Sequence, residues 1–85
     1  MRLFLQQKPT AGEAPKFVQL ILEQDLLGGW CLVKETGHTG GRSQLKREQF
    51  LQHDAAIIAF EKARDARVKR GFQIMFVQGA DAPEH

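Results

Sequence analysis

The stretch from residue 32 to residue 43, LVKETGHTGGRS, holds the residues whose types and spacing could best do chemistry, because Gly37, Gly40 and Gly41 stand beside His38 and Arg42. Glycine-rich loops can hold phosphate groups, but these glycines do not match the dinucleotide fingerprint, and no Lys-Ser/Thr pair follows them as in a phosphate loop. No helix is expected directly after them to hold an anion at its N-terminus. The local pattern therefore favours a hairpin turn built on glycines with positive φ.

Catalytic and metal-binding chemistry finds little support elsewhere in the sequence. The three histidines, His38, His53 and His85, lack a helical i, i+4 partner or a cysteine at ligand spacing, which argues against a metal site. Cys31 lies between two apolar residues, which is typical of a packed thiol rather than a nucleophile. No Ser/His/Asp or Cys/His set emerges from the spacing. We therefore expect a protein that is not an enzyme and needs no cofactor or metal.

Composition predicts one small soluble domain. The chain has 85 residues, of which 42% are hydrophobic, and this is enough for a single core. A single cysteine excludes an intrachain disulfide and fits a reducing cytoplasm, and no apolar run approaches the roughly 18 residues of a membrane span. The net charge of +2 mildly favours an anionic partner. We expect a domain over residues 1–78, a flexible tail over 79–85, and a cytoplasmic location away from membranes.

Hydrophobic periodicity predicts five strands and one helix. Period-two patterns and apolar runs bounded by turn residues indicate strands over residues 2–6, 17–23, 30–35, 42–49 and 72–77. A period-3.6 pattern indicates a helix over residues 54–70, with Gly71 as its C-cap and an apolar stripe of Ala56, Ile57, Phe60 and Ala63. Short hairpin connections then predict an α+β fold, an antiparallel sheet of about four to five strands with one α-helix packed across one face.

Basic residues gather in two parts of the chain. One group surrounds the glycine-rich hairpin and comprises Lys34, His38, Arg42 and Lys46. The other occupies the last turns of the helix and comprises Arg64, Arg67, Lys69 and Arg70. In the strand over residues 42–49, Leu45 is expected to point inward and its basic neighbours to point to the exposed side. Either a solvated surface or a phosphate-binding patch fits this pattern.

Several landmarks occur in an order that resembles the WGR domain, both its short free-standing bacterial versions and the module inside poly(ADP-ribose) polymerases. They are the sequences DLLGGW, LVKE and TGGR, the aromatic residue Phe50 before the helix, and the sequence KRGF at residues 69–72. The likeness covers about residues 17–72. It implies an antiparallel sheet with one helix across it, in agreement with the fold that periodicity predicts.

The resemblance also implies a function. In the polymerases the domain binds DNA near breaks, where the Trp of a Trp-Gly-Arg triplet stacks on the terminal nucleotide and the Arg contacts the backbone. Here the triplet is Thr36, Gly37 and His38. Threonine lacks a stacking face, which contributes about 1–3 kcal/mol per base, and a neutral histidine lacks the fixed charge and two-pronged geometry of arginine. We expect the family's turn to persist and its DNA binding to weaken.

Three hypotheses follow from these observations. The first is weak, sequence-independent nucleic-acid binding, with DNA as the partner, through Lys34, Thr36, Gly37, His38, Arg42, Lys46, Arg67, Lys69 and Arg70. The second is a protein–protein interaction module with a degenerate tip, because Ile21 and Ile58 are expected on exposed faces. The third is binding that strengthens at low pH, because a protonated His38 would restore part of the missing arginine charge.

Overall fold

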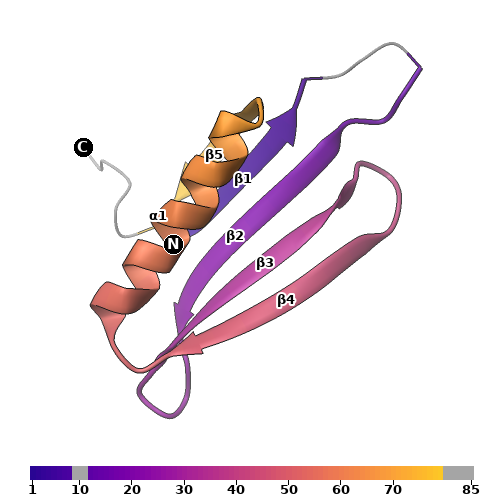
Figure 1. The fold of residues 1–85 in the computed structure, drawn as a ribbon. Helices are drawn as coiled ribbons and strands as arrows, with labels where there is room; N and C mark the ends of the chain where they lie inside the picture. The colour runs from indigo at the N-terminus through magenta and orange to yellow at the C-terminus, as the bar shows by residue number, and fades with distance from the viewer. Residues whose placement is uncertain (9–11, 80–85) are drawn as a thin grey trace.

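The computed structural model describes residues 1–8 and 12–79 of the chain (Figure 1). In chain order the elements are β1 (Arg2–Gln7), β2 (Lys16–Gln24), β3 (Trp30–His38), β4 (Ser43–Phe50), α1 (His53–Lys69) and β5 (Phe72–Gln78). Every strand and the helix expected from periodicity are confirmed, with boundaries that differ by at most three residues. Apart from Gly79, the tail expected over residues 79–85 lies outside the described residues.

The strands form one antiparallel sheet in the order β4-β3-β2-β1-β5. Periodicity did not predict this order. The first four strands are joined as successive hairpins, and α1 then carries the chain back so that β5 pairs with β1. The helix packs across one face of the sheet, and the β3–β4 hairpin lies to the side of it (Figure 1). The expected α+β class is confirmed.

The core lies between the helix and the strands that it covers. Alternate residues of β1, β2 and β3 point toward the helix and are buried, and α1 and β5 complete the cluster. Its members are Leu3, Leu5, Val18, Leu20, Leu22, Leu32, Ala56, Phe60 and Phe72. Burial of each large apolar side chain contributes about 1.5–3 kcal/mol, so this single layer carries most of the stability of the fold. The predicted helical stripe is confirmed, since Ile57 and Ala63 pack against the same cluster.

A glycine follows the end of the helix, one residue beyond the C-cap, which is Arg70 and not Gly71 as predicted. Gly71 has a φ of 93°, and its N–H donates to the carbonyl oxygen of Val68 at 3.0 Å. Residues with a side chain rarely adopt this left-handed conformation, whereas glycine adopts it freely. The reversal brings Phe72, the first residue of β5, directly below the last turns of the helix, where its side chain is buried.

The prediction for the two faces of β4 was wrong. The register pairs Lys34 with Lys46 and Glu35 with Leu45, and Lys34 lies on the same face of β3 as the core residue Leu32. Lys46 therefore points to the helix side of the sheet, whereas Leu45 lies on the uncovered face and is 51% exposed. Since β4 is an edge strand and is exposed from Ser43 to Gln49, neither of its faces must be apolar. One leucine therefore could not reveal its direction.

Candidate nucleic-acid interface

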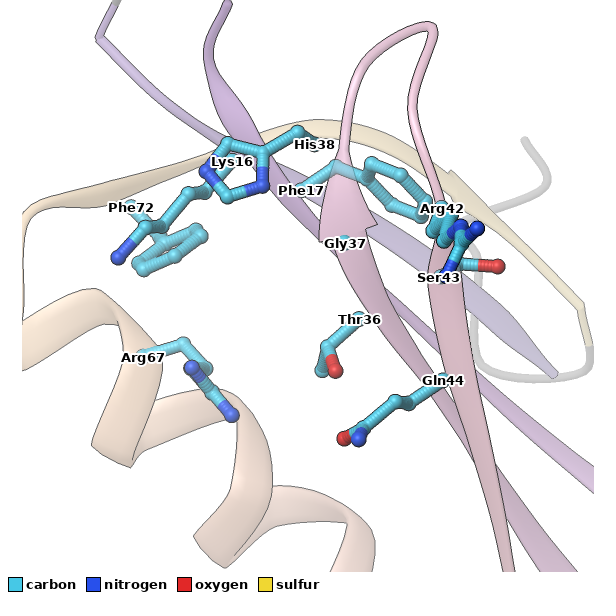
Figure 2. A pocket seen from close by; sticks show the side chains of 10 residues that line it. All are labelled: Lys16, Phe17, Thr36, Gly37, His38, Arg42, Ser43, Gln44, Arg67 and Phe72. Carbon is cyan, nitrogen blue, oxygen red and sulfur yellow. The ribbon is translucent and has the colours of Figure 1, made fainter.

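A groove opens between the C-terminal turns of α1 and the adjoining ends of the strands (Figure 2). Its larger part is a cavity of about 570 Å³ lined by Lys16, Phe17, Thr36, Gly37, His38, Arg42, Ser43, Gln44, Arg67 and Phe72. A smaller cavity of about 190 Å³ shares Thr36 and Arg67 with it and is also lined by Val18, Leu20, Lys34, Ala63, Ala66 and Arg70. We call the two cavities together the basic groove.

The charge of the basic groove has one sign. Its lining includes five Lys or Arg residues, namely Lys16, Lys34, Arg42, Arg67 and Arg70, together with His38. Neither cavity has an aspartate or glutamate among its lining residues. A concave surface lined by charges of one sign focuses the electrostatic potential and attracts ligands of the opposite charge. The groove is therefore suited to an anionic ligand.

Arg67 is the best-positioned cation of the groove. Its side chain is half-buried, and the guanidinium carbon lies 5.6 Å from the centre of the Phe72 ring. A cation over an aromatic face gains about 0.5–1 kcal/mol, and the planar guanidinium keeps its N–H donors free at its edge. In Figure 2 the Arg67 side chain extends from the helix toward the space in front of Thr36 and Gln44. The helix end and β5 thus orient this charge before any ligand arrives.

The opposite wall of the groove comes from cross-strand neighbours. Thr36 of β3 pairs with Gln44 of β4, and both side chains point into the cavity (Figure 2). His38 at the end of β3 pairs with Lys16 at the start of β2. These neighbours place hydroxyl, amide and cationic groups together, all of which can hydrogen-bond to phosphate oxygens.

Lys34 and Lys46 lie directly opposite each other on the helix side of β3 and β4. Like charges at such a position destabilise a sheet. The structure describes one ion pair among residues 1–8 and 12–79, and it involves neither lysine. A bound anion would relieve this repulsion.

The carboxylate of Glu35, which precedes Thr36 in β3, is held on the other face of the sheet. Glu35 accepts a hydrogen bond from the Gln19 side-chain amide at 3.2 Å and another from the Ser43 hydroxyl at 2.8 Å. These contacts keep its negative charge on the uncovered face, where it does not neutralise the groove.

The glycine-rich stretch forms a hairpin turn, as predicted, but its glycines serve different purposes. Gly40 has a φ of 79°, and the Gly41 N–H donates to the His38 carbonyl oxygen at 2.9 Å. Gly37, in contrast, is part of β3 and does not have a positive φ. A Cβ at this position would meet the carbonyl oxygen of Arg42 and lie 2.9 Å from the Cα of Ser43. Gly37 is therefore needed for close strand approach, and the expectation of a positive φ was wrong for this glycine.

Of the residues predicted to bind nucleic acid, Lys34, Thr36, Gly37, His38, Arg42, Arg67 and Arg70 line the basic groove. Lys46 lies beside it through its pairing with Lys34, whereas Lys69 is exposed and lines neither cavity. Arg64 donates to the Asp65 carboxylate at 2.9 Å, a hydrogen bond that raises the pKa of Arg64 above the usual arginine value. Arg64 is thus engaged outside the groove.

Sequence reasoning missed several residues that line the groove, among them Lys16, Gln44 and Phe72. Lys16 was not selected because it comes just before the strand predicted over residues 17–23 and belongs to no basic cluster in the sequence. Its position beside His38 depends on the pairing of β2 with β3. Phe72 was noted only as the aromatic residue after Gly71, and its contact with Arg67 requires the reversal at the helix end.

Among residues 1–8 and 12–79, no group of three or more His, Cys, Asp or Glu side chains is arranged to hold a metal ion. The one helix in this described part of the chain is not long and apolar enough to cross a membrane.

Comparison with known proteins supplies the family. The family model described as the WGR domain matches residues 1–75, which cover the whole sheet except the end of β5, and all of α1. No curated protein and no solved structure gave a match. The matched region includes every residue that lines the basic groove. This chain belongs to the WGR domain family.

Proposed function

We propose that this domain is a non-enzymatic module that binds nucleic acid weakly and without sequence preference, holding the phosphate backbone of DNA in the basic groove. The observation that carries the proposal is that the basic groove brings together cations of the hairpin and cations of the helix end. No aspartate or glutamate is among the residues that line it. Membership of a family associated with nucleic-acid binding supports it.

The chemistry of the groove favours contacts to phosphate over contacts to bases. Arginine and lysine side chains with neighbouring hydroxyl and amide groups form the usual phosphate-binding set, and such contacts carry no sequence information. The position that would stack on a base in the polymerases is Thr36, which has no π-face. Binding should therefore be dominated by charge, and it should be weak because stacking makes no contribution.

Salt dependence tests this proposal directly. Each phosphate neutralised on duplex DNA contributes about −0.9 to the slope of log K against log salt concentration, so four contacts give a slope of about −3.6. Between 50 and 200 mM salt the affinity should then fall roughly 150-fold. Fluorescence anisotropy with a labelled duplex measures this slope. A slope near zero, or no binding at 50 mM salt, would overturn the proposal.

The same assay can compare the affinity of the domain for different forms of DNA. A nicked duplex with a 5′-phosphate, an intact duplex and a single strand present the backbone in different shapes. The groove is lined by His38 and Arg42, which lie beside the β3–β4 turn, and we propose that these residues meet the phosphate at a backbone end. We expect the nicked, phosphorylated duplex to bind most tightly of the three.

A second candidate function, protein binding, is favoured by a different observation. At the β2–β3 turn Leu26 and Leu27 are 102% and 94% exposed. The backbone of this turn is held by the Asp25 carboxylate, which accepts hydrogen bonds from the N–H groups of Leu27 at 2.8 Å and Gly29 at 2.9 Å. A pre-ordered apolar tip loses little entropy on docking. A photo-crosslinking group at Leu26 should capture a defined protein in the native cell, whereas the same group at Lys62 should not. Absence of any crosslinked protein would exclude this candidate.

A further inference from the structure

The strand β5 is an edge of the sheet that lacks the usual protection among residues 1–8 and 12–79. Its sequence, FQIMFVQ over Phe72–Gln78, contains no charged residue and no proline. The four consecutive side chains from Ile74 to Val77 are between 46% and 54% exposed, so both faces of the strand are apolar and open. Outer edges of sheets present free backbone N–H and C=O groups, and proteins normally blunt them with charge, proline or a covering element.

The opposite edge of the same sheet shows the contrast. There β4 carries Lys46, Arg47 and Glu48 in succession, and every residue from Ser43 to Gln49 is exposed. Charged edges of this kind resist pairing with another strand. Only the β5 edge of the sheet is therefore suited to accept a further strand.

We propose that β5 pairs with β5 of a second copy of this chain, in antiparallel orientation about a two-fold axis, to give one continuous ten-stranded sheet. A second copy is the occupant that the composition favours, because an uncharged strand meets no like charges when it is placed opposite itself. The proposal concerns a surface away from the basic groove and does not depend on nucleic-acid binding.

The bulge in β5 selects a register for this pairing. Against β1, Val77 pairs with Leu3 and Ile74 with Leu5, so Met75 is the extra residue, and Ile74 and Val77 both lie on the helix side of the sheet. An axis between Met75 and Phe76 places Ile74 opposite Val77 of the partner subunit. It also places Met75 opposite Phe76 of the partner subunit. Apolar residues thus meet apolar residues, and the helix-side pair stays on the helix side.

The same register matches the glutamines of the strand. Gln73 pairs with Gln6, and Gln78 pairs with Arg2, so both glutamines lie on the face away from the helix. The proposed axis places Gln73 opposite Gln78 of the partner subunit. Amide side chains can hydrogen-bond to each other across such a pair. In this register each apolar side chain of β5 from Ile74 to Val77 faces an apolar side chain, and each of the two glutamines faces a glutamine.

The helix side of the edge offers additional apolar surface. A cavity of about 200 Å³ lies between α1 and β5, lined by Met1, Leu3, Phe60, Ile74 and Val77 with Glu61 and Arg64 completing it. In the proposed dimer both helices lie on the same face of the joined sheet, because the two-fold axis runs through the sheet. Each copy then covers part of the cavity of the other, and the two charged residues add no net charge to the junction.

The assembly closes on itself and is expected to be weak. Pairing uses both β5 edges and leaves only the charged β4 edges at the outside, so growth stops at two chains. One pair of short strands buries less than a standard interface of about 1,600 Å². We expect a Kd of roughly 10–500 μM, in the range of weak and transient interfaces.

Sedimentation equilibrium of the chain from about 10 μM to 1 mM tests the proposal, with the range chosen to span the expected Kd. Met75→Lys places a lysine beside the axis in each copy, where the two like charges oppose pairing. We expect Kd to rise at least tenfold, because the lysine replaces the apolar side chain that faces Phe76 of the partner subunit, and because the two lysines lie diagonally across the axis from each other. Leu45→Lys is the matched control, because it makes the same type of change at a side chain of similar exposure on the β4 edge. Dimerisation should survive this change.

Three results would overturn the proposal. They are a parent chain that is monomeric up to 1 mM, a Met75→Lys variant that dimerises as well as the parent, and a dimer lost in Leu45→Lys but kept in Met75→Lys. The last result would locate the interface on the uncovered sheet face. Far-UV circular dichroism of each variant checks that it is folded. In a sample that mixes two labelling patterns, nuclear Overhauser contacts between Ile74 and Val77 methyl groups of different chains should report the proposed register.

Discussion

Replacement of Arg67 by glutamine is the most informative single perturbation of the basic groove. Arg67 lines both cavities, is half-buried, and lies over the Phe72 ring, so it is the cation whose position is most firmly set before binding. Glutamine retains most of the side-chain length and a polar end but removes the charge. The change therefore tests charge with little loss of packing volume.

The expected effect on binding follows from the loss of one charge-assisted contact. Hydrogen bonds to charged groups contribute about 1.5–3 kcal/mol, which corresponds to a loss of affinity of roughly 10- to 150-fold at low salt. The slope of log K against log salt should also fall in magnitude by about 0.9, because one fewer phosphate is neutralised. Anisotropy titrations of a labelled duplex at 50, 100 and 200 mM salt measure both quantities.

A matched variant separates local geometry from total charge. Lys62→Gln removes one positive charge from the same helix, at an exposed position that lines neither cavity. It should leave both affinity and slope nearly unchanged. Equal losses in the two variants would refute the reasoning, because binding would then depend on net charge and not on the groove.

The stability of the Arg67 variant must be compared at the same time. Loss of the interaction with Phe72 costs about 0.5–1 kcal/mol, which lowers the Tm of a domain of this size by a few degrees. A larger fall in Tm would mean that Arg67 supports the fold itself. The binding result is informative when the variant remains folded at the temperature of the titration.

Three further predictions concern the hairpin. Restoring the family triplet with Thr36→Trp and His38→Arg should raise affinity for DNA by 10-fold or more in the same titration, since a stacked base contributes about 1–3 kcal/mol, and an unchanged Kd would show that the groove does not meet a base. Gly37→Ala should lower the free energy of unfolding in urea by about 1–3 kcal/mol, because the added Cβ meets the Arg42 carbonyl and Ser43, and an unaltered midpoint would contradict the close approach. A protonated histidine carries a positive charge, so the parent should bind DNA more tightly at pH 5.5 than at pH 7.5, and His38→Ala should lose most of this difference. An equal pH response in both proteins would assign it to another group.

Elements that bury a clear apolar pattern could be predicted from the sequence. The alternation of Val18, Leu20 and Leu22 requires one buried face of β2, and the spacing of Ala56 and Phe60 requires one buried face of α1. Such patterns show which face of a strand or helix is buried, and they can be recognised within a short segment of the sequence. They were sufficient for the fold class and for the positions of the strands.

Long-range pairing could not be predicted in this way. The direction of β4 depends on its register with β3, and a strand that is exposed throughout carries no pattern that reveals that register. The place of Lys16 beside His38 and the contact of Arg67 with Phe72 likewise depend on which segments meet in space. Of the five Lys and Arg residues that line the groove, all but Lys16 were nevertheless selected, because the basic residues cluster in the sequence. The triplet positions could be identified from the family resemblance.

The most direct test of the nucleic-acid proposal is an amide chemical-shift titration with a nicked, 5′-phosphorylated duplex at about 50 mM salt, a concentration at which phosphate contacts remain strong. We expect shifts that weaken as salt is added and that are confined to β3 and β4 from Lys34 to Lys46, to Lys16, and to the end of α1 around Arg67 and Arg70. Intact duplex and single strand should shift the same residues to a smaller extent. Shifts confined to the β2–β3 turn or to β5, or no shifts at all, would contradict the proposal that the basic groove binds nucleic acid.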